Sequence, residues 1–375
     1  MTNSGEPLLR VEHLRIEVPS RRGTLVAVDD ISFMIAPGEV LGVVGESGAG
    51  KSLTGAAIIG LLEPPLRIAG GRIHFAGRRI DNLPYEAMRR IRGKDIGAIF
   101  QDPLTSLNPL YTVGRQLVET IQTHLDLDAA AARKRALDLL KEVGIPGAEH
   151  RIDHYPHQFS GGMRQRVVIA LALCANPRLI IADEPTTALD VSIQAQIIAL
   201  LKRLCRDHRT AVMLVTHDMG VIAETADRVA VMYAGRIAEI GPVRQIIQRP
   251  QHPYTVGLMG SIPAIGTARE RLAQIDGAMP RPGAVPAGCA FNPRCPHAFA
   301  RCRVERPELM PSGASRSACW LHAAGAGQIS SPLRGEDQGE GDPRRPALAG
   351  SGAQAAAPPH PNLSPQGRGG GTPHG

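Results

Sequence analysis

Short apolar runs alternate with amphipathic segments along the chain up to about residue 245. Three runs, at residues 39–46, 179–185 and 211–218, are apolar in the middle and end in polar residues, which predicts buried strands. Residues 130–144 and 191–205 instead repeat apolar positions at helical spacing, and one face of the second helix carries Ile193, Ile197, Leu200, Leu201 and Leu204. Residues 229–241 predict a hairpin that turns near Ala234-Gly235. Strands that alternate with helices favour an α/β fold with a mainly parallel sheet covered on both faces.

Composition divides the 375 residues into three predicted parts: a domain at 1–245, an extension at 246–325 rich in Pro, Arg and Cys, and a tail at 326–375. The tail holds 11 Gly and 8 Pro and no aromatic residue. Such a segment cannot bury enough apolar surface to offset its ordering entropy, so we predict that it is disordered. The longest apolar run, residues 167–175, is far shorter than the roughly 20 residues of a membrane-spanning helix.

Composition also excludes some classes of function. Aromatic residues make up only 3%, which argues against a protein that stacks single-stranded nucleic acid on aromatic rings. The net charge of +7 is modest: it suits phosphate ligands or an anionic membrane surface but is weak evidence for either. The N-terminus shows no secretory signal, so the six cysteines are expected to be thiols or metal ligands rather than disulfides.

A phosphate-binding loop (P-loop) follows the first buried strand. The sequence GESGAGKS fits G-x-x-x-x-G-K-[ST] at every fixed position, with Gly45, Glu46, Ser47, Gly48, Ala49, Gly50, Lys51 and Ser52. Its glycines let main-chain N–H groups curl around phosphate oxygens, Lys51 can reach the β- and γ-phosphates, and Ser52 can bind Mg²⁺. By itself the loop predicts only a nucleoside triphosphatase.

Two further segments complete the predicted site. The strand LIIADEP delivers Asp183 and Glu184 to its carboxyl end, where open α/β sheets bind ligands. Asp183 suits the Mg²⁺ shell, and Glu184 suits a general base that orients the attacking water. In FSGGM, Ser160 can cap a helix whose first turn, Gly161 and Gly162, offers a second phosphate cradle. Because one nucleotide does not need two cradles from one chain, the pair predicts a head-to-tail dimer.

With these motifs in this order, the chain resembles the ATP-binding subunit of an ATP-binding-cassette (ABC) importer from about Leu8 to Ile262. The resemblance implies an antiparallel β subdomain, a helical subdomain at about 103–175, and contact of Ser160 and Gly162 with ATP held by the partner chain. It also implies roles for a Q-loop glutamine at the Mg²⁺/water site, a D-loop aspartate and a switch histidine on the γ-phosphate, which here are Gln101, Asp190 and His217.

Two positions depart from the family pattern. Met163 replaces the usual signature glutamine, as in peptide-type importers, and we attach no loss of function to it. No aromatic residue occurs between Arg10 and Ile31, where the family stacks a ring on adenine. Val18 and the pair Arg21 and Arg22 are the alternatives for this contact.

The segments IFQDPLTSLNP and QRPQHPYTVGLMGSIP resemble the peptide, nickel and opine branch of these importers. This branch implies two membrane permease subunits, an identical or paralogous ATPase subunit, an extracytoplasmic solute-binding protein that acts indirectly, and no nucleic acid. The ATPase would lie peripherally on the cytoplasmic face of the inner membrane. The alternative is an ABC ATPase that acts on DNA or the ribosome, but such proteins usually insert a long coiled coil or duplicate the cassette, and this chain has neither feature.

The extension contains four cysteines, Cys289, Cys295, Cys302 and Cys319, with 5, 6 and 16 intervening residues. Four thiols in a segment poor in core-forming residues predict one tetrathiolate site, and the spacing alone leaves zinc and iron–sulfur open. The importer resemblance implies a [4Fe–4S] cluster. The sequence HPYT predicts only a turn that leaves the catalytic domain, and loss of the cluster is expected to affect folding or permease docking before nucleotide binding. Cys174 and Cys205 lie in apolar helical patterns and are predicted core residues.

Overall fold

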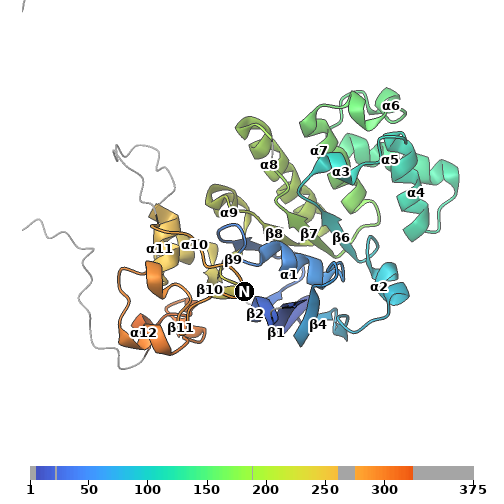
Figure 1. Ribbon diagram of the computed structural model, residues 1–375. Coiled ribbons are helices and arrows are strands. Elements are labelled where there is room, and N and C mark those ends of the chain that lie inside the picture. The colour runs from blue at the N-terminus through green and yellow to red at the C-terminus, as the bar shows by residue number, and fades with distance from the viewer. Residues whose placement is uncertain (1–5, 22, 188, 261–274, 324–375) are drawn as a thin grey trace, which may run out of the picture. The chain divides into compact units, whose positions relative to one another are not determined.

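An eight-stranded sheet runs through the part of the chain that the computed structural model describes, which is residues 6–21, 23–187, 189–260 and 275–323 (Figure 1). Five neighbouring strands are parallel, in the order β9 (Arg228–Tyr233), β3 (Val40–Val44), β8 (Ala211–Val215), β7 (Leu179–Asp183) and β6 (Ile96–Ile99). Strand β10 (Arg236–Pro242) forms the predicted hairpin with β9. The three apolar runs therefore form the central strands β3, β7 and β8, and the prediction of a mainly parallel sheet is confirmed.

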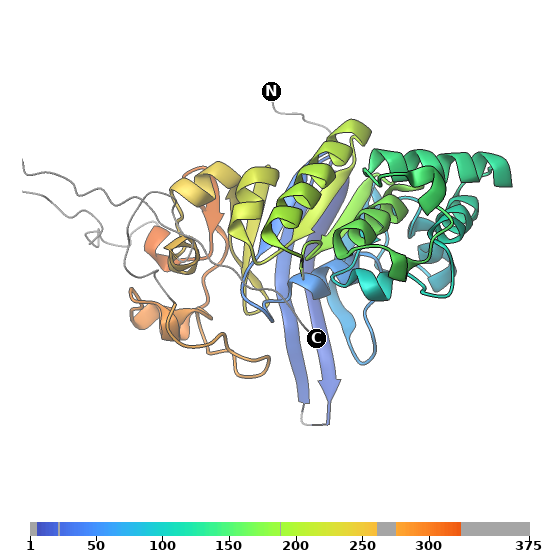
Figure 2. The same ribbon diagram turned by 90° about the horizontal axis from the view of Figure 1, so that it is seen from above.

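A second, antiparallel sheet has the order β2-β1-β4-β5. Its strands are β1 (Leu9–Ser20), β2 (Gly23–Ile35), β4 (Arg67–Phe75) and β5 (Arg78–Arg79). Figure 2 shows β1 and β2 as two long blue strands that extend beyond the helices. One apolar cluster packs β1, β2 and β4 against β3, β8 and helix α1 (Lys51–Ile58), so the antiparallel sheet is fastened directly to the strand that precedes the P-loop.

Helices cover the other side of the central sheet. A larger apolar cluster packs them against β7 and β8 with Leu117, Leu140, Ile169 and Ile197 among its fully buried members. Figure 1 shows α3 to α7 gathered on one side of the unit. Helix α2 (Tyr85–Ile91) belongs instead to the first cluster, together with α1. The other helices in this part of the chain are α3 (Pro103–Ser106), α4 (Val113–His124), α5 (Ala129–Glu142), α6 (Ala148–Arg151), α7 (Gly161–Leu173), α8 (Val191–His208) and α9 (Met219–Thr225).

Side-chain caps set the starts of several of these helices. Thr112 accepts a hydrogen bond from the main chain of α4, Asp128 from that of α5 and Asp218 from that of α9. Both predicted helices are confirmed as α5 and α8. Of the five apolar positions predicted on one face of α8, four are buried and Ile193 is partly exposed. Cys174 and Cys205 lie in the core as predicted.

The extension is built into the central sheet. Helix α10 (Val243–Gln248) spans its predicted start, and the extension then contains α11 (Pro253–Gly260), α12 (Ala300–Val304), β11 (Met310–Ser312) and β12 (Ser315–Ser317). Strand β12 pairs with β10, with Glu239 opposite Ser317, and β11 continues the sheet. HPYT is not merely a turn, because it begins α11 and buries His252 and Tyr254 completely or nearly so.

A buried carboxylate holds the segment at Gln251 and His252, where the chain enters α11. Glu239 is 0% exposed and accepts hydrogen bonds from the main-chain N–H of Gln251 (3.0 Å) and of His252 (2.9 Å) and from the Ser315 hydroxyl (3.3 Å). The described residues form one compact unit, and the boundary at residue 245 stays a prediction. The predicted disordered tail, 326–375, lies outside the described residues. None of the helices in the described ranges combines the length and apolarity needed to cross a bilayer.

Candidate nucleotide site

The P-loop leaves the carboxyl end of β3 and runs into α1. Gly45, Gly48 and Gly50 have φ values of 149°, 83° and 98°, which favour glycine. At Gly45 an added Cβ would lie 2.2 Å from the carbonyl oxygen of Met232, so no other residue fits there. The loop therefore depends on its fixed glycines both for its turns and for its close approach to β9.

Lys51 folds back over this loop. Its Nζ donates to the carbonyl oxygens of Gly45 (2.8 Å) and Glu46 (3.1 Å), and its side chain is buried. Burial lowers the pKa of the Lys51 ammonium, and the nearby carboxylates of Glu184 and Asp183 oppose this effect. The lysine is thus a partly desolvated cation held above the loop, a position suited to an anionic ligand.

Next to the loop, the Ser52 hydroxyl donates to Oδ1 of Asp183 at 3.0 Å. Asp183 ends β7, whose apolar residues bury the strand up to that point. Burial raises the pKa of the Asp183 carboxyl, while the Ser52 hydrogen bond acts in the opposite direction. The two predicted Mg²⁺ ligands of the P-loop and of β7 are therefore in direct contact, with oxygen donors that Mg²⁺ prefers.

Glu184 is the centre of a small polar network. Its Oε2 accepts from Nε2 of Gln101 (3.2 Å) and from the Thr187 hydroxyl (2.9 Å), and its Oε1 lies 3.3 Å from Nδ1 of His217. The residue has φ 46°, uncommon for a side chain of this size. Two predicted residues from separate segments, Gln101 and His217, thus converge on the Glu184 carboxylate. Thr187 was not predicted, although its hydroxyl lies only three residues after Glu184 in the sequence.

The remaining predicted residues lie at the starts of two other helices. Ser160 caps α7 and accepts from the main-chain N–H of Met163 at 3.4 Å. Gly161 is exposed, and a Cβ on Gly162 would lie 2.8 Å from Ile193. Asp190 is exposed and precedes α8. Among the described residues, none of these four hydrogen-bonds to the P-loop, so the structure does not assemble the two cradles within one chain.

The extension contributes contacts that the sequence did not predict. The Tyr254 hydroxyl accepts from the main-chain N–H of Glu46 at 2.9 Å, and Arg294 forms an ion pair with the Glu46 carboxylate at 3.0 Å. Met279 packs near Gly48, with its Cε 3.1 Å from a Cβ built there. Of the residues considered for the adenine contact, Val18 pairs with Leu25 across β1 and β2, and Arg22 lies outside the described residues.

The four extension cysteines line one small cavity together with His252, Phe291 and Trp320. Burial raises the pKa of the Cys289 thiol to about 11 and that of Cys319 to about 12. In the parts of the chain that the structure describes, no three His, Cys, Asp or Glu side chains are grouped so that they could hold a metal ion. The thiols therefore share one cavity without forming a single-ion site.

Comparisons with known proteins agree with this fold and site. A family model described as "ABC transporter" matches residues 28–187, and one described as "Oligopeptide/dipeptide transporter, C-terminal region" matches residues 238–302. The dipeptide transport ATP-binding protein DppD of Bacillus subtilis is 49% identical over 318 residues, which are 84% of this chain and 95% of that protein. DppD of Escherichia coli is 45% identical over 322 residues, 86% of this chain and 98% of that protein.

Among solved structures, the dimeric structure of MJ0796, a bacterial ABC transporter cassette, is similar with a TM-score of 0.56 and 30% identity, covering 63% of this chain and 99% of that chain. A post-hydrolysis dimer of the same cassette, bound to ADP and Pi, gives a TM-score of 0.57 at 29% identity and covers the same shares. The fold and the site define an ATP-hydrolysing cassette of the ABC class. Within that class, the chain belongs to the ATP-binding subunits of the oligopeptide/dipeptide transporter family.

Proposed function

We propose that this subunit binds MgATP at the P-loop and hydrolyses it to drive the import of dipeptides or oligopeptides. The observation that carries the proposal is the network around Glu184, which lies beside the Ser52–Asp183 pair and is held by Gln101 and His217. A nucleotide loop, a Mg²⁺ ligand pair and a carboxylate base are the parts that phosphoryl transfer to water requires.

In this proposal each residue has one task. The N–H groups of the P-loop and Lys51 bind the phosphates, and the Ser52 hydroxyl, the Asp183 carboxylate and the Gln101 side chain hold Mg²⁺. The bound ion would neutralise negative charge on the phosphate oxygens. Glu184 accepts the proton of the attacking water. His217, which lies next to Glu184, contacts the γ-phosphate.

Ser160, Gly161, Gly162 and Asp190 complete the site of a partner subunit. This assignment is supported by their place at two helix starts, apart from the P-loop network, and by the dimeric cassettes that the chain resembles. A helix N-terminus with free N–H groups is suited to a phosphate. The partner is an identical or paralogous ATPase subunit.

The two ATPase subunits would bind two membrane permease subunits on the cytoplasmic face of the inner membrane, and a solute-binding protein would deliver peptide from outside. The curated relatives named above are dipeptide transport proteins, which supports peptide as the cargo. The alternative of an ABC ATPase that acts on DNA or the ribosome is not favoured, because these relatives are transport proteins.

We further propose that Cys289, Cys295, Cys302 and Cys319 bind a [4Fe–4S] cluster. Four thiols around one partly apolar cavity provide the donor set of such a cluster. Each cysteine binds a different iron of a cluster, whereas the thiolates of a zinc site all lie about 2.3 Å from one ion. The choice of iron over zinc rests on the resemblance of the cysteine pattern to that of the peptide-importer branch.

The test is ATP turnover by the subunit co-purified with its permeases in lipid vesicles that also receive the solute-binding protein. Dipeptides are expected to stimulate turnover in the wild type and not in Lys51→Ala. Stimulation by another solute and not by peptides would refute the cargo, and equal turnover in Lys51→Ala would refute the nucleotide site.

A further inference from the structure

The extension reaches the P-loop through one buried arginine. The Arg294 side chain is only 8% exposed, although arginine is among the most polar residues. Its Nε and Nη2 donate to the carbonyl oxygens of Asp276 (2.8 Å) and Ile275 (3.1 Å), so its own segment fixes the guanidinium plane. Nη1 then donates to both carboxylate oxygens of Glu46, at 3.0 Å and 3.1 Å. The arginine is thus a rigid support that ends on the P-loop.

Glu46 is held at all its polar groups. Its carboxylate binds Arg294, its main-chain N–H donates to the Tyr254 hydroxyl, and its carbonyl oxygen accepts from Nζ of Lys51. Two of these three partners belong to the extension, and the third is the phosphate-binding lysine. A single residue of the loop therefore connects Lys51 with Arg294 and Tyr254.

The loop needs such support, because glycine residues at positive φ leave it many alternative conformations. The Arg294 side chain is 8% exposed and that of Glu46 29%, and a partly buried, hydrogen-bonded ion pair has a strict geometry, so loss of one partner leaves an uncompensated charge. The contact of Arg294 with Glu46 therefore restricts the loop more than an exposed surface pair would.

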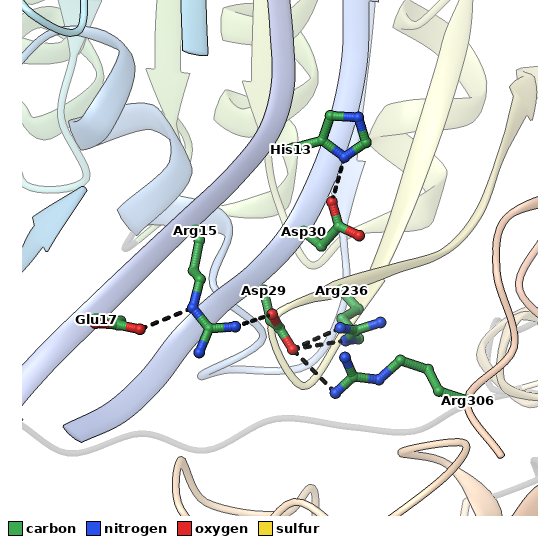
Figure 3. A network of polar contacts seen from close by, with 7 residues as sticks. All are labelled: His13, Arg15, Glu17, Asp29, Asp30, Arg236 and Arg306. Atoms are coloured by element: carbon green, nitrogen blue, oxygen red, sulfur yellow. Dashed lines mark hydrogen bonds and ion pairs between the residues drawn. The ribbon is translucent and has the colours of Figure 1, made fainter. Parts of the chain in front are cut away.

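A second arginine of the extension forms an ion pair with the antiparallel sheet (Figure 3). Arg306 lies 3.1 Å from Asp29 of β2, and the same carboxylate binds Arg236 at 2.6 Å. Arg236 follows Gly235, whose N–H donates to the carbonyl oxygen of Ala49 at 3.0 Å. The extension thus contacts the P-loop through Arg294. Through Asp29 it is also linked to the β9–β10 hairpin, which hydrogen-bonds to the P-loop.

We propose that Arg294 is a positioning residue of the nucleotide site, which acts through Glu46 to hold the P-loop ready for phosphate and so couples the extension to nucleotide affinity. The inference rests on the proposed assignment of the P-loop as the ATP site. It goes beyond the expectation that loss of the cluster affects folding or permease docking before nucleotide binding, because Arg294 of the same extension contacts the P-loop directly. Coupling of this kind is reciprocal, so bound nucleotide also stabilises the extension.

The test measures the Kd of MgATP for the intact subunit by calorimetry. Arg294→Gln and Glu46→Gln each remove the ion pair from one side, and each is expected to raise Kd about fivefold or more, the lower range of couplings between sites. The double variant should bind MgATP no more weakly than either single variant, because the two substitutions remove the same contact. Arg294→Lys should recover only part of the affinity, since lysine cannot keep the fork of hydrogen bonds.

Arg301→Gln is the matched control. Arg301 lies in the same extension, forms an exposed pair with Glu305 and stacks over Trp320, so its loss should leave Kd unchanged. Glu46→Gln changes the loop side alone and keeps the test valid if Arg294→Gln fails to fold. A wild-type Kd in Glu46→Gln, or additive effects in the double variant, would overturn the proposal. Normal MgATP binding by Lys51→Ala would instead refute the nucleotide site itself.

Hydrogen exchange distinguishes coupling from a purely structural role of the Arg294–Glu46 pair. MgATP should slow amide exchange in residues 289–304 of the wild type, and this protection should disappear in Glu46→Gln at saturating MgATP. Equal protection in both proteins would contradict the coupling through Arg294.

Discussion

Glu184→Gln separates the chemistry of the site from its structure. In the wild type, Oε2 of Glu184 accepts from Gln101 and Thr187, and the amide oxygen of glutamine can take over both hydrogen bonds. The amide nitrogen would then face Nδ1 of His217, now 3.3 Å from Oε1, which can accept when the ring carries its proton on Nε2. The variant should therefore keep its fold and its ability to bind MgATP.

The variant does lose the group that accepts a proton from water. A general base contributes about 10²–10⁴-fold to a rate. We therefore expect turnover of the assembled transporter to fall by that factor, which corresponds to about 3–5 kcal/mol in the barrier. The Kd of MgATP should change by less than about fivefold, because at most one neutral hydrogen bond is altered. Steady-state phosphate release and equilibrium binding on the same preparation measure the two quantities.

Thr187→Val is the control for this test. It removes one hydrogen bond to Glu184 but keeps the carboxylate, so turnover should fall by no more than about tenfold. Near-normal turnover in Glu184→Gln would refute the assignment of the base. Loss of MgATP binding together with turnover would show that Glu184 has a structural role instead.

Three further predictions concern other parts of the chain. Lys51→Ala should raise the Kd of MgATP about 10- to 100-fold, the value of a charged hydrogen bond, in equilibrium binding. Glu239→Ala should lower the free energy of unfolding by about 3 kcal/mol, measured in urea, because it leaves two buried N–H groups without an acceptor; Glu239→Gln should lose less. Burial raises the pKa of the Cys205 thiol from 9.0 to about 12. The neutral thiol therefore stabilises the folded protein fully below pH 9.0, and this contribution is lost as the pH rises towards 12. In thermal melts, the Tm of Cys205→Ala should fall less above pH 9.0 than the Tm of the wild type.

Local patterns in the sequence were enough to predict the parts of the site that lie on single elements. The P-loop, the strand that ends in Asp183 and the helix α8 each follow from a period or a motif within about twenty residues. The roles of Gln101 at the Mg²⁺/water site and of His217 on the γ-phosphate were expected only through the family resemblance, since these residues lie on separate segments. Their hydrogen bonds to one carboxylate come from the tertiary structure.

The place of the extension was decided by tertiary structure alone. Strand β12 is three residues long, too short to show an alternating pattern, and yet it pairs with β10 and closes over the buried Glu239. Arg294 meets Glu46 across 248 residues of chain, and neither residue lies at a fixed position of a motif. A local pattern reports which face of an element is buried, but the choice of a partner for a buried charge depends on how distant elements pack together.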